Sequence, residues 1–108
     1  MVTIKKIFRV NTKNESYAIY EVTDFLTNIV EGNYDTTHTN KVTGYKVIET
    51  SYIPAKLSDY HEDSYKVGVE VYTEQHNINK AKNHFNRMES EIYDNYAVNV
   101  AGSEEGYW

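Results

Sequence analysis

The sequence predicts an α+β domain with a mainly antiparallel sheet of four to five strands and one long amphipathic helix near the C-terminus. Two observations predict this class. Apolar and polar residues alternate along several short segments, which is the period of a strand. Late in the chain the apolar residues recur every three or four positions, which is the period of a helix. Four strands with one late helix are typical of an α+β fold, and 108 residues suit one domain.

The first strand is predicted over residues 2–10. Its apolar side chains share one face, on which Lys6 is the exception; they are Val2, Ile4, Phe8 and Val10. Lys5 and Arg9 fall on the other face, and we interpret them as the charges that protect an edge strand. The alternative is a basic surface for an acidic partner.

The next segment has a less definite pattern. Residues 11–14 are predicted to form a turn, and residues 17–22 a returning strand. Residues 23–32 fit either a continuation of that strand or a short helix, which Thr23 would cap and Gly32 would stop.

Two more strands are predicted in the middle of the chain. Residues 42–53 form a long β-prone run that Pro54 ends, and residues 66–72 give the clearest alternation of all. In the latter segment three side chains are expected to point inward, namely Val67, Val69 and Val71. Residues 33–40 and 55–64 are predicted loops.

The late helix is predicted from a single apolar stripe that follows a cap at Asn77 or Asn79. The members of the stripe are three, four, three and four residues apart: Ile78, Ala81, Phe85, Met88 and Ile92. Because this spacing keeps the side chains on one side of a helix, they are candidates for the core.

The chain is predicted to end with a short strand over residues 96–100, which Gly102 stops. We therefore assign residues 1–102 to the domain and residues 103–108 to a loose C-terminal tail.

Composition excludes several classes of protein. The chain has no cysteine, which removes disulfides, thiol catalysis and cysteine-based zinc sites. No apolar run approaches the length of a membrane span or resembles a signal peptide, so we expect a cytoplasmic protein without a membrane partner. A net charge of −5 argues against direct nucleic-acid binding. The charge is uneven: residues 1–14 carry four positive charges and no negative one, and residues 15–39 carry five negative charges and no positive one.

Tyrosine is unusually abundant, with 11 residues against three phenylalanines and one tryptophan. A small core cannot bury so many phenols, because each buried hydroxyl needs a hydrogen-bonding partner. Several tyrosines are therefore expected on the surface, where they suit a binding face. A codon bias toward tyrosine in an AT-rich genome is the alternative explanation.

The segment Leu57–Tyr65, LSDYHEDSY, is the densest cluster of titratable residues. Asp59, His61 and Asp63 alternate, but the segment lacks the glycine and the twelfth-position glutamate of a calcium loop. His76 and His84 are eight residues apart, so they do not have the spacing of zinc ligands on a helix. The five glycines form no phosphate-binding loop. We expect no catalytic residue, no metal and no cofactor, and we interpret the segment as a solvated acidic loop that can contact a protein.

These observations favour a non-catalytic binding protein whose partner is a basic protein surface, such as that of a nucleic-acid enzyme. In size, acidity and tyrosine content the chain resembles small phage or mobile-element inhibitors of host defence nucleases, the anti-CRISPR type, which act by nucleic-acid mimicry. The predicted partner-binding residues are tyrosines and carboxylates in and after the acidic loop: Asp59, Tyr60, Glu62, Asp63, Glu70, Tyr72 and Glu74. The alternatives are a self-associating assembly protein, such as a homodimer, and a small hydrolase that uses His61 or His38.

Overall fold

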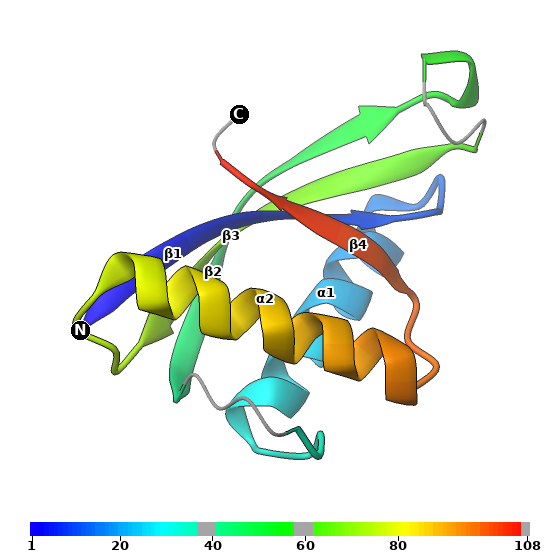
Figure 1. The fold of residues 1–108 in the computed structure, drawn as a ribbon. Coiled ribbons are helices and arrows are strands. Elements are labelled where there is room, and N and C mark those ends of the chain that lie inside the picture. The colour runs from blue at the N-terminus through cyan, green and yellow to red at the C-terminus, as the bar shows by residue number, and fades with distance from the viewer. Residues whose placement is uncertain (37–40, 58–61, 107–108) are drawn as a thin grey trace.

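The computed structural model describes residues 1–36, 41–57 and 62–106, and it shows an α+β domain with a four-stranded antiparallel sheet and two helices (Figure 1). The elements in chain order are β1 (Val2–Val10), α1 (Glu15–Val30), β2 (Val42–Ile53), the short 3-10 helix η1 (Ala55–Leu57), β3 (Ser64–Thr73), α2 (Ile78–Asn95) and β4 (Val100–Glu105). The predicted α+β class is confirmed. The described residues form two helices, where the sequence predicted one long helix and left a second, short one open over residues 23–32.

The strands lie in the order β2-β3-β1-β4, and every neighbouring pair is antiparallel. β1 is therefore an interior strand, in which Phe8 pairs with Val67 of β3 on one side and with Ser103 of β4 on the other. The interpretation of Lys5 and Arg9 as the charges of an edge strand is wrong. It fails because β4 pairs with β1 from Lys6 to Val10, on the side opposite to β3, and so covers that edge.

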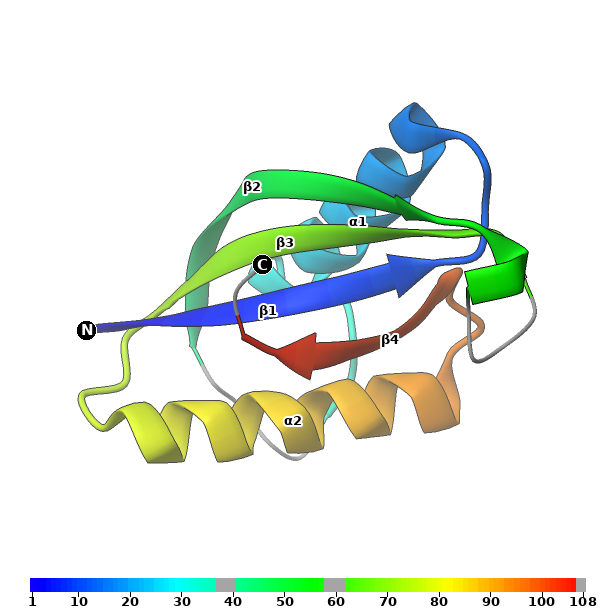
Figure 2. The same ribbon diagram turned by 90° about the horizontal axis from the view of Figure 1, so that it is seen from above.

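Both helices lie beneath the sheet in Figure 1, and the view from above shows no described helix over the opposite face (Figure 2). The core fills the space between the sheet and the helices. The Phe8 ring centroid lies 5.7 Å from that of Phe25 in α1 and 6.5 Å from that of Phe85 in α2. The three inward valines of β3 are buried as predicted. One apolar layer thus joins both helices to the sheet.

Residues 17–22 belong to α1, so the prediction of a returning strand there is wrong. Asn14 caps the helix, because its Oδ1 accepts a hydrogen bond from the Tyr17 N–H at 2.9 Å. The buried side chains of the helix are Ala18, Val22, Phe25 and Leu26. Burying this face outweighs the β preference of the tyrosine, isoleucine and valine residues in the segment.

The ambiguous segment over residues 23–32 is helical as far as Val30. Thr23 lies inside the helix and is not its cap, since its Oγ1 donates to the Tyr20 carbonyl one turn back. Gly32 follows the helix with φ of +72°, a conformation that favours glycine, which agrees with its predicted role as the stop.

α2 confirms the predicted helix and its cap at Asn77, whose side chain accepts hydrogen bonds from the N–H groups of Asn79 and Lys80. Four members of the predicted stripe are buried, whereas Ile78, in the first turn, is 39% exposed. The buried face also includes Glu89, which the apolar stripe did not predict.

β4 starts and ends later than the strand predicted over residues 96–100, so that prediction is wrong. Tyr96 instead ends α2 as its C-terminal cap. Gly102 lies inside β4 opposite Arg9, beside a register shift that bends the ladder, and its φ of +149° suits glycine. Residues 103–105 pair with β1 and are not part of a loose tail. Neither described helix is long and apolar enough to cross a membrane.

Candidate functional site

The residues predicted to bind a partner do not gather at one place. Asp59 and Tyr60 lie outside the described residues, as do His38 and His61. The other predicted residues lie along β3: Glu62 and Asp63 precede the strand, Glu70 and Tyr72 lie within it, and Glu74 follows it. Ten residues of strand are about 33 Å long. The two ends of β3 are therefore too far apart to form a single compact site.

Asp63, at the start of β3, is engaged in holding the β2–β3 connection. Its Oδ1 accepts hydrogen bonds from the Tyr52 hydroxyl at 2.7 Å and from the Ala55 N–H at 2.9 Å, and its Oδ2 lies 3.4 Å from the Lys13 Nζ. The pKa of Asp63 is lowered, chiefly by the Tyr52 hydrogen bond and then by the Ala55 N–H. Glu62 beside it is exposed and is the freer carboxylate for an external partner.

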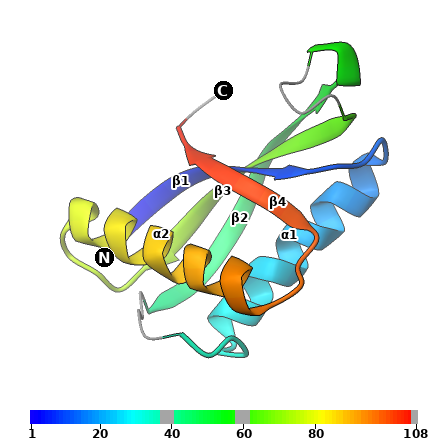
Figure 3. The ribbon, with the colours of Figure 1, turned by 45° about the vertical axis from the view of Figure 1, so that its right-hand side comes forward.

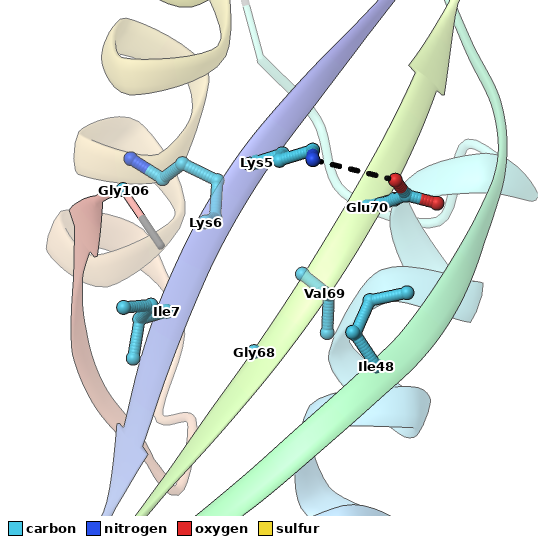
Figure 4. Close-up of a pocket in the computed structure, with 8 residues that line it drawn as sticks. All are labelled: Lys5, Lys6, Ile7, Ile48, Gly68, Val69, Glu70 and Gly106. Atoms are coloured by element: carbon cyan, nitrogen blue, oxygen red, sulfur yellow. Dashed lines mark ion pairs between the residues drawn. The ribbon is translucent and has the colours of Figure 1, made fainter. Parts of the chain in front are cut away.

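Glu70 and Tyr72 lie on the face of the sheet that no described helix covers. The Glu70 carboxylate is 3.9 Å from the Lys5 Nζ and accepts a hydrogen bond from the Tyr72 hydroxyl at 3.3 Å. Burial, followed by the charge of Glu70, raises the pKa of Tyr72. Figure 4 shows the ion pair at the rim of a shallow hollow on this face, near Ile7 and Ile48. Ile48 is 51% exposed, so the hollow has an apolar wall open to solvent.

A further acidic surface follows α1, within the block of five negative charges to which the sequence pattern assigned no site. One stripe of the helix repeats at intervals of four, three, four and three residues: Tyr17, Glu21, Asp24, Asn28 and Glu31. We call this stripe the acidic face of α1. Tyr17, at the start of this face, is 42% exposed, and Tyr20 beside the face is 61% exposed. Among the described residues, no carboxylate of this face forms an ion pair.

A second hollow lies beside the middle of the acidic face, between α1 with the segment that follows it and the connection from α2 to β4. Figure 3 shows the ribbon of these elements. Its volume is about 180 Å³. Carboxylates and aromatic rings line it together with the backbone that leads into β4; they are Glu21, Asp24, Phe25, Tyr34 and Tyr96. We call it the aromatic–acidic hollow. The combination of negative charge and π faces can bind a cation.

The rings of the aromatic–acidic hollow are fixed by contacts with one another. The centroid of Tyr34 lies 5.0 Å from that of Tyr96 in an edge-to-face arrangement, and 5.9 Å from that of the buried Phe25. The Tyr96 hydroxyl accepts a hydrogen bond from the Asp35 N–H at 3.0 Å. Burial raises the pKa of Tyr34, the Asn28 hydrogen bond opposes this, and the charge of Asp24 adds to the increase. The Tyr34 hydroxyl therefore stays neutral at physiological pH.

A polar cluster that the sequence analysis missed lies buried between α2 and the sheet. The Lys6 Nζ is 3.7 Å from Glu89 and donates a hydrogen bond to the Asn86 Oδ1 at 2.8 Å. Glu89 also accepts hydrogen bonds from the hydroxyls of Ser103, at 2.7 Å, and Tyr93. Both charged residues are 4% exposed, so the cluster joins α2 to β1 and β4 rather than facing a ligand. The sequence held one signal of this cluster, since Lys6 is the one charged residue on an otherwise apolar face of β1.

The sequence matches no protein-family model and no curated protein. Within the part of the chain that the structure describes, no group of three or more histidine, aspartate or glutamate side chains is arranged to hold a metal ion.

Proposed function

We propose that the protein is a non-catalytic, cytoplasmic inhibitor of the phage or mobile-element type. Its acidic face of α1 imitates nucleic acid and occupies the basic nucleic-acid-binding surface of a host defence nuclease. The supporting observation is the uncompensated charge of this face. Residues 14–40 contain no lysine or arginine, and none of the ion pairs among the described residues gives a carboxylate of the face a basic partner.

The spacing of the charges suits this mimicry. At a rise of about 1.5 Å per residue, Glu21 and Asp24 are about 4.5 Å apart along the helix axis, and Glu31 lies about 10 Å beyond Asp24. A row of about 15 Å matches four or five phosphate steps of about 3.4 Å along one strand of a duplex. Lysine and arginine side chains that normally meet phosphates over this length would meet three carboxylates instead, two of which lie one helical turn apart.

The exposed tyrosines add contact area to the charge. Tyr17 and Tyr20 flank the row on the outside of α1, and burial followed by the nearby Glu21 raises the pKa of Tyr17, which keeps its hydroxyl protonated. Tyrosine rings are enriched at the centres of protein interfaces, because one residue supplies both apolar area and a polar tip. In a nucleic-acid groove such rings would stand where bases stack.

The residues first predicted from the acidic loop remain secondary contacts in this proposal. Glu62 and Glu74 are exposed at the two ends of β3 and extend the negative potential. Asp63 and Glu70 each have an internal lysine partner, which reduces the charge that they present to another protein. Asp59 is a prediction outside the described residues.

Assembly through the sheet edge has less support. β2 is a long edge strand, but its pairing with β3 shifts register between Val42 and Gly44 and again between Val47 and Glu49. Such bulges twist an edge away from regular pairing with another chain.

The proposal is tested by capturing the nuclease from the native host on immobilised protein. The wild-type chain should retain a nucleic-acid enzyme that is released by a duplex oligonucleotide and by raised salt, because both compete for or screen the basic surface. The variant Asp24→Asn/Glu31→Gln should retain much less. The control Glu49→Gln/Asp94→Asn removes the same charge from exposed positions elsewhere and should behave as wild type. Retention that neither oligonucleotide nor salt weakens would overturn the proposal, as would equal loss in both variants.

A further inference from the structure

We propose that the aromatic–acidic hollow binds an arginine side chain of the protein partner. This inference rests on the proposed function and assigns to it one specific contact. The hollow is built by two separate segments. The first, α1 with the chain just after it, supplies both carboxylates together with Phe25 and Tyr34, and the second, the connection from α2 to β4, supplies Tyr96.

The carboxylates supply the charge for such a contact. Glu21 and Asp24 are three residues apart, so they lie on the same side of α1 about one turn from each other. Neither has an ion-pair partner among the described residues. A guanidinium group carries five N–H donors in a planar fork and can donate to two carboxylates at once.

The aromatic rings supply the surface for a planar cation. Tyr34 and Tyr96 meet edge to face at 5.0 Å, and Phe25 closes the bottom of the hollow at 2% exposure. Arginine is attracted to ring faces and is less strongly hydrated than the ammonium group of lysine. The rings should therefore favour arginine over lysine, whereas carboxylates alone would bind either.

Other occupants fit this hollow less well. An anion or a phosphate group would be repelled by the two carboxylates at its rim. A divalent metal ion prefers six or more oxygen ligands, and the described residues offer no group of three acidic or histidine side chains. A neutral apolar group would leave both carboxylates without compensation as it excluded water from them.

Binding is measured with two acetylated nonapeptides of equal charge, one of arginine and one of lysine, followed by fluorescence anisotropy and by 1H–15N NMR. The arginine peptide should bind about tenfold more tightly, a difference of about 1.4 kcal/mol. The largest amide shifts should fall on Glu21, Asp24, Tyr34 and the segment from Tyr96 to Val98. Equal affinity for the two peptides, or shifts spread evenly along α1, would overturn the inference.

Two matched variants separate the hollow from general acidity. Glu21→Gln/Asp24→Asn should weaken arginine-peptide binding about tenfold, whereas Glu31→Gln/Asp35→Asn, which removes the same charge outside the hollow, should weaken it about threefold or less. Equal losses in the two variants would show diffuse attraction and overturn the site.

The aromatic contribution has its own variant, because Tyr96→Leu leaves the charge unchanged. Tyr96 is 37% exposed, so the domain should tolerate this substitution, which circular dichroism would verify. The preference for arginine over lysine should disappear in Tyr96→Leu, and a preserved preference would overturn the role of the rings. If the preference is found but the chain inhibits no nuclease, the proposed function fails while the arginine site stands. If the chain inhibits the nuclease but binds both peptides equally, the arginine site fails while the proposed function stands.

Discussion

Replacing Glu89 by alanine should lower the free energy of unfolding by about 3–5 kcal/mol. The carboxylate lies in the buried cluster where α2 meets β1 and β4, and three of its neighbours depend on it. The Lys6 ammonium, 3.7 Å away, loses its counter-charge, and the hydroxyls of Ser103 and Tyr93 lose their acceptor. With a typical stability of about 5–15 kcal/mol, a loss of this size threatens the fold at ordinary temperature.

The magnitude follows from burial. Lys6 and Glu89 have side chains that are 4% and 6% exposed, so solvent cannot replace the missing partner. Removing one member of a buried ion pair costs about 3–5 kcal/mol because the other charge stays buried. The hydrogen bond from Lys6 to Asn86 remains, which places the expected loss near the lower end of that range. A matched surface substitution, Glu104→Ala, removes an exposed partner of Lys66 and should cost about 0–1 kcal/mol.

Urea unfolding followed by circular dichroism at 222 nm measures both variants. The double variant Lys6→Met/Glu89→Leu should be more stable than Glu89→Ala, because it leaves no unpaired charge in the core. A loss for Glu89→Ala as small as that for Glu104→Ala would refute the account of the cluster, and so would a double variant less stable than the single one.

Three further outcomes are expected from the structure. Phe8→Ala should lower the free energy of unfolding by about 3–5 kcal/mol in the same urea assay, because it leaves a cavity where the Phe8 ring contacts Phe25 of α1 and Phe85 of α2. A loss below about 1 kcal/mol would contradict this core. Asn14→Ala should cost about 1 kcal/mol through loss of the α1 cap, with Asn14→Ser close to wild type; equal stability of the two variants would argue against the cap. Burial, followed by the charge of Glu89, raises the pKa of Tyr93 above its ordinary value of 10.0, so its contribution to stability is complete below pH 10 and is lost as pH rises further. Unfolding measured from pH 8 to 11 should therefore show a steeper alkaline loss for wild type than for Tyr93→Phe, and identical profiles would contradict the assignment.

β1, β2, β3 and α2 could be predicted because their residues satisfy both local preference and the periodicity of the folded state. β1, β2 and α2 have the bounds or the stripe that the pattern indicated. α1 could not be recognised in the same way. Its first half contains Tyr17, Ile19, Tyr20 and Val22, whose β preference hides the helical spacing of the buried residues. The segment is helical because contacts with the sheet stabilise the helix, and a local sequence pattern does not contain these contacts.

The end of the chain was misjudged for a related reason. Gly102 suggested a stop, yet in the sheet it is the residue that allows β4 to bend beside β1. Ser103 and Glu105 lack the apolar alternation of a strand because their partners, Glu89 and Lys82, are polar residues of α2. Such pairing between distant segments becomes visible only in the fold.

The candidate surfaces could likewise be predicted from the sequence only in part. The block of negative charge over residues 15–39 is evident in the sequence, but three of its five carboxylates, Glu21, Asp24 and Glu31, share one face only because the segment is helical. The loop before β3 was predicted to bind a partner because it is rich in acidic residues. The Asp63 carboxylate instead holds that loop together. The aromatic–acidic hollow could not be anticipated, since it joins Asp24 to Tyr96, which is 72 residues farther along the chain.

The central claim is that the acidic face of α1 takes the place of nucleic acid on a nuclease. The most direct test is the affinity of the captured nuclease for a labelled target duplex at increasing concentrations of the protein. Competition for one surface predicts that the apparent Kd rises in proportion to protein concentration, and that Asp24→Asn/Glu31→Gln loses most of this effect while Glu49→Gln/Asp94→Asn keeps it. An unchanged duplex affinity in the presence of saturating protein would contradict the claim.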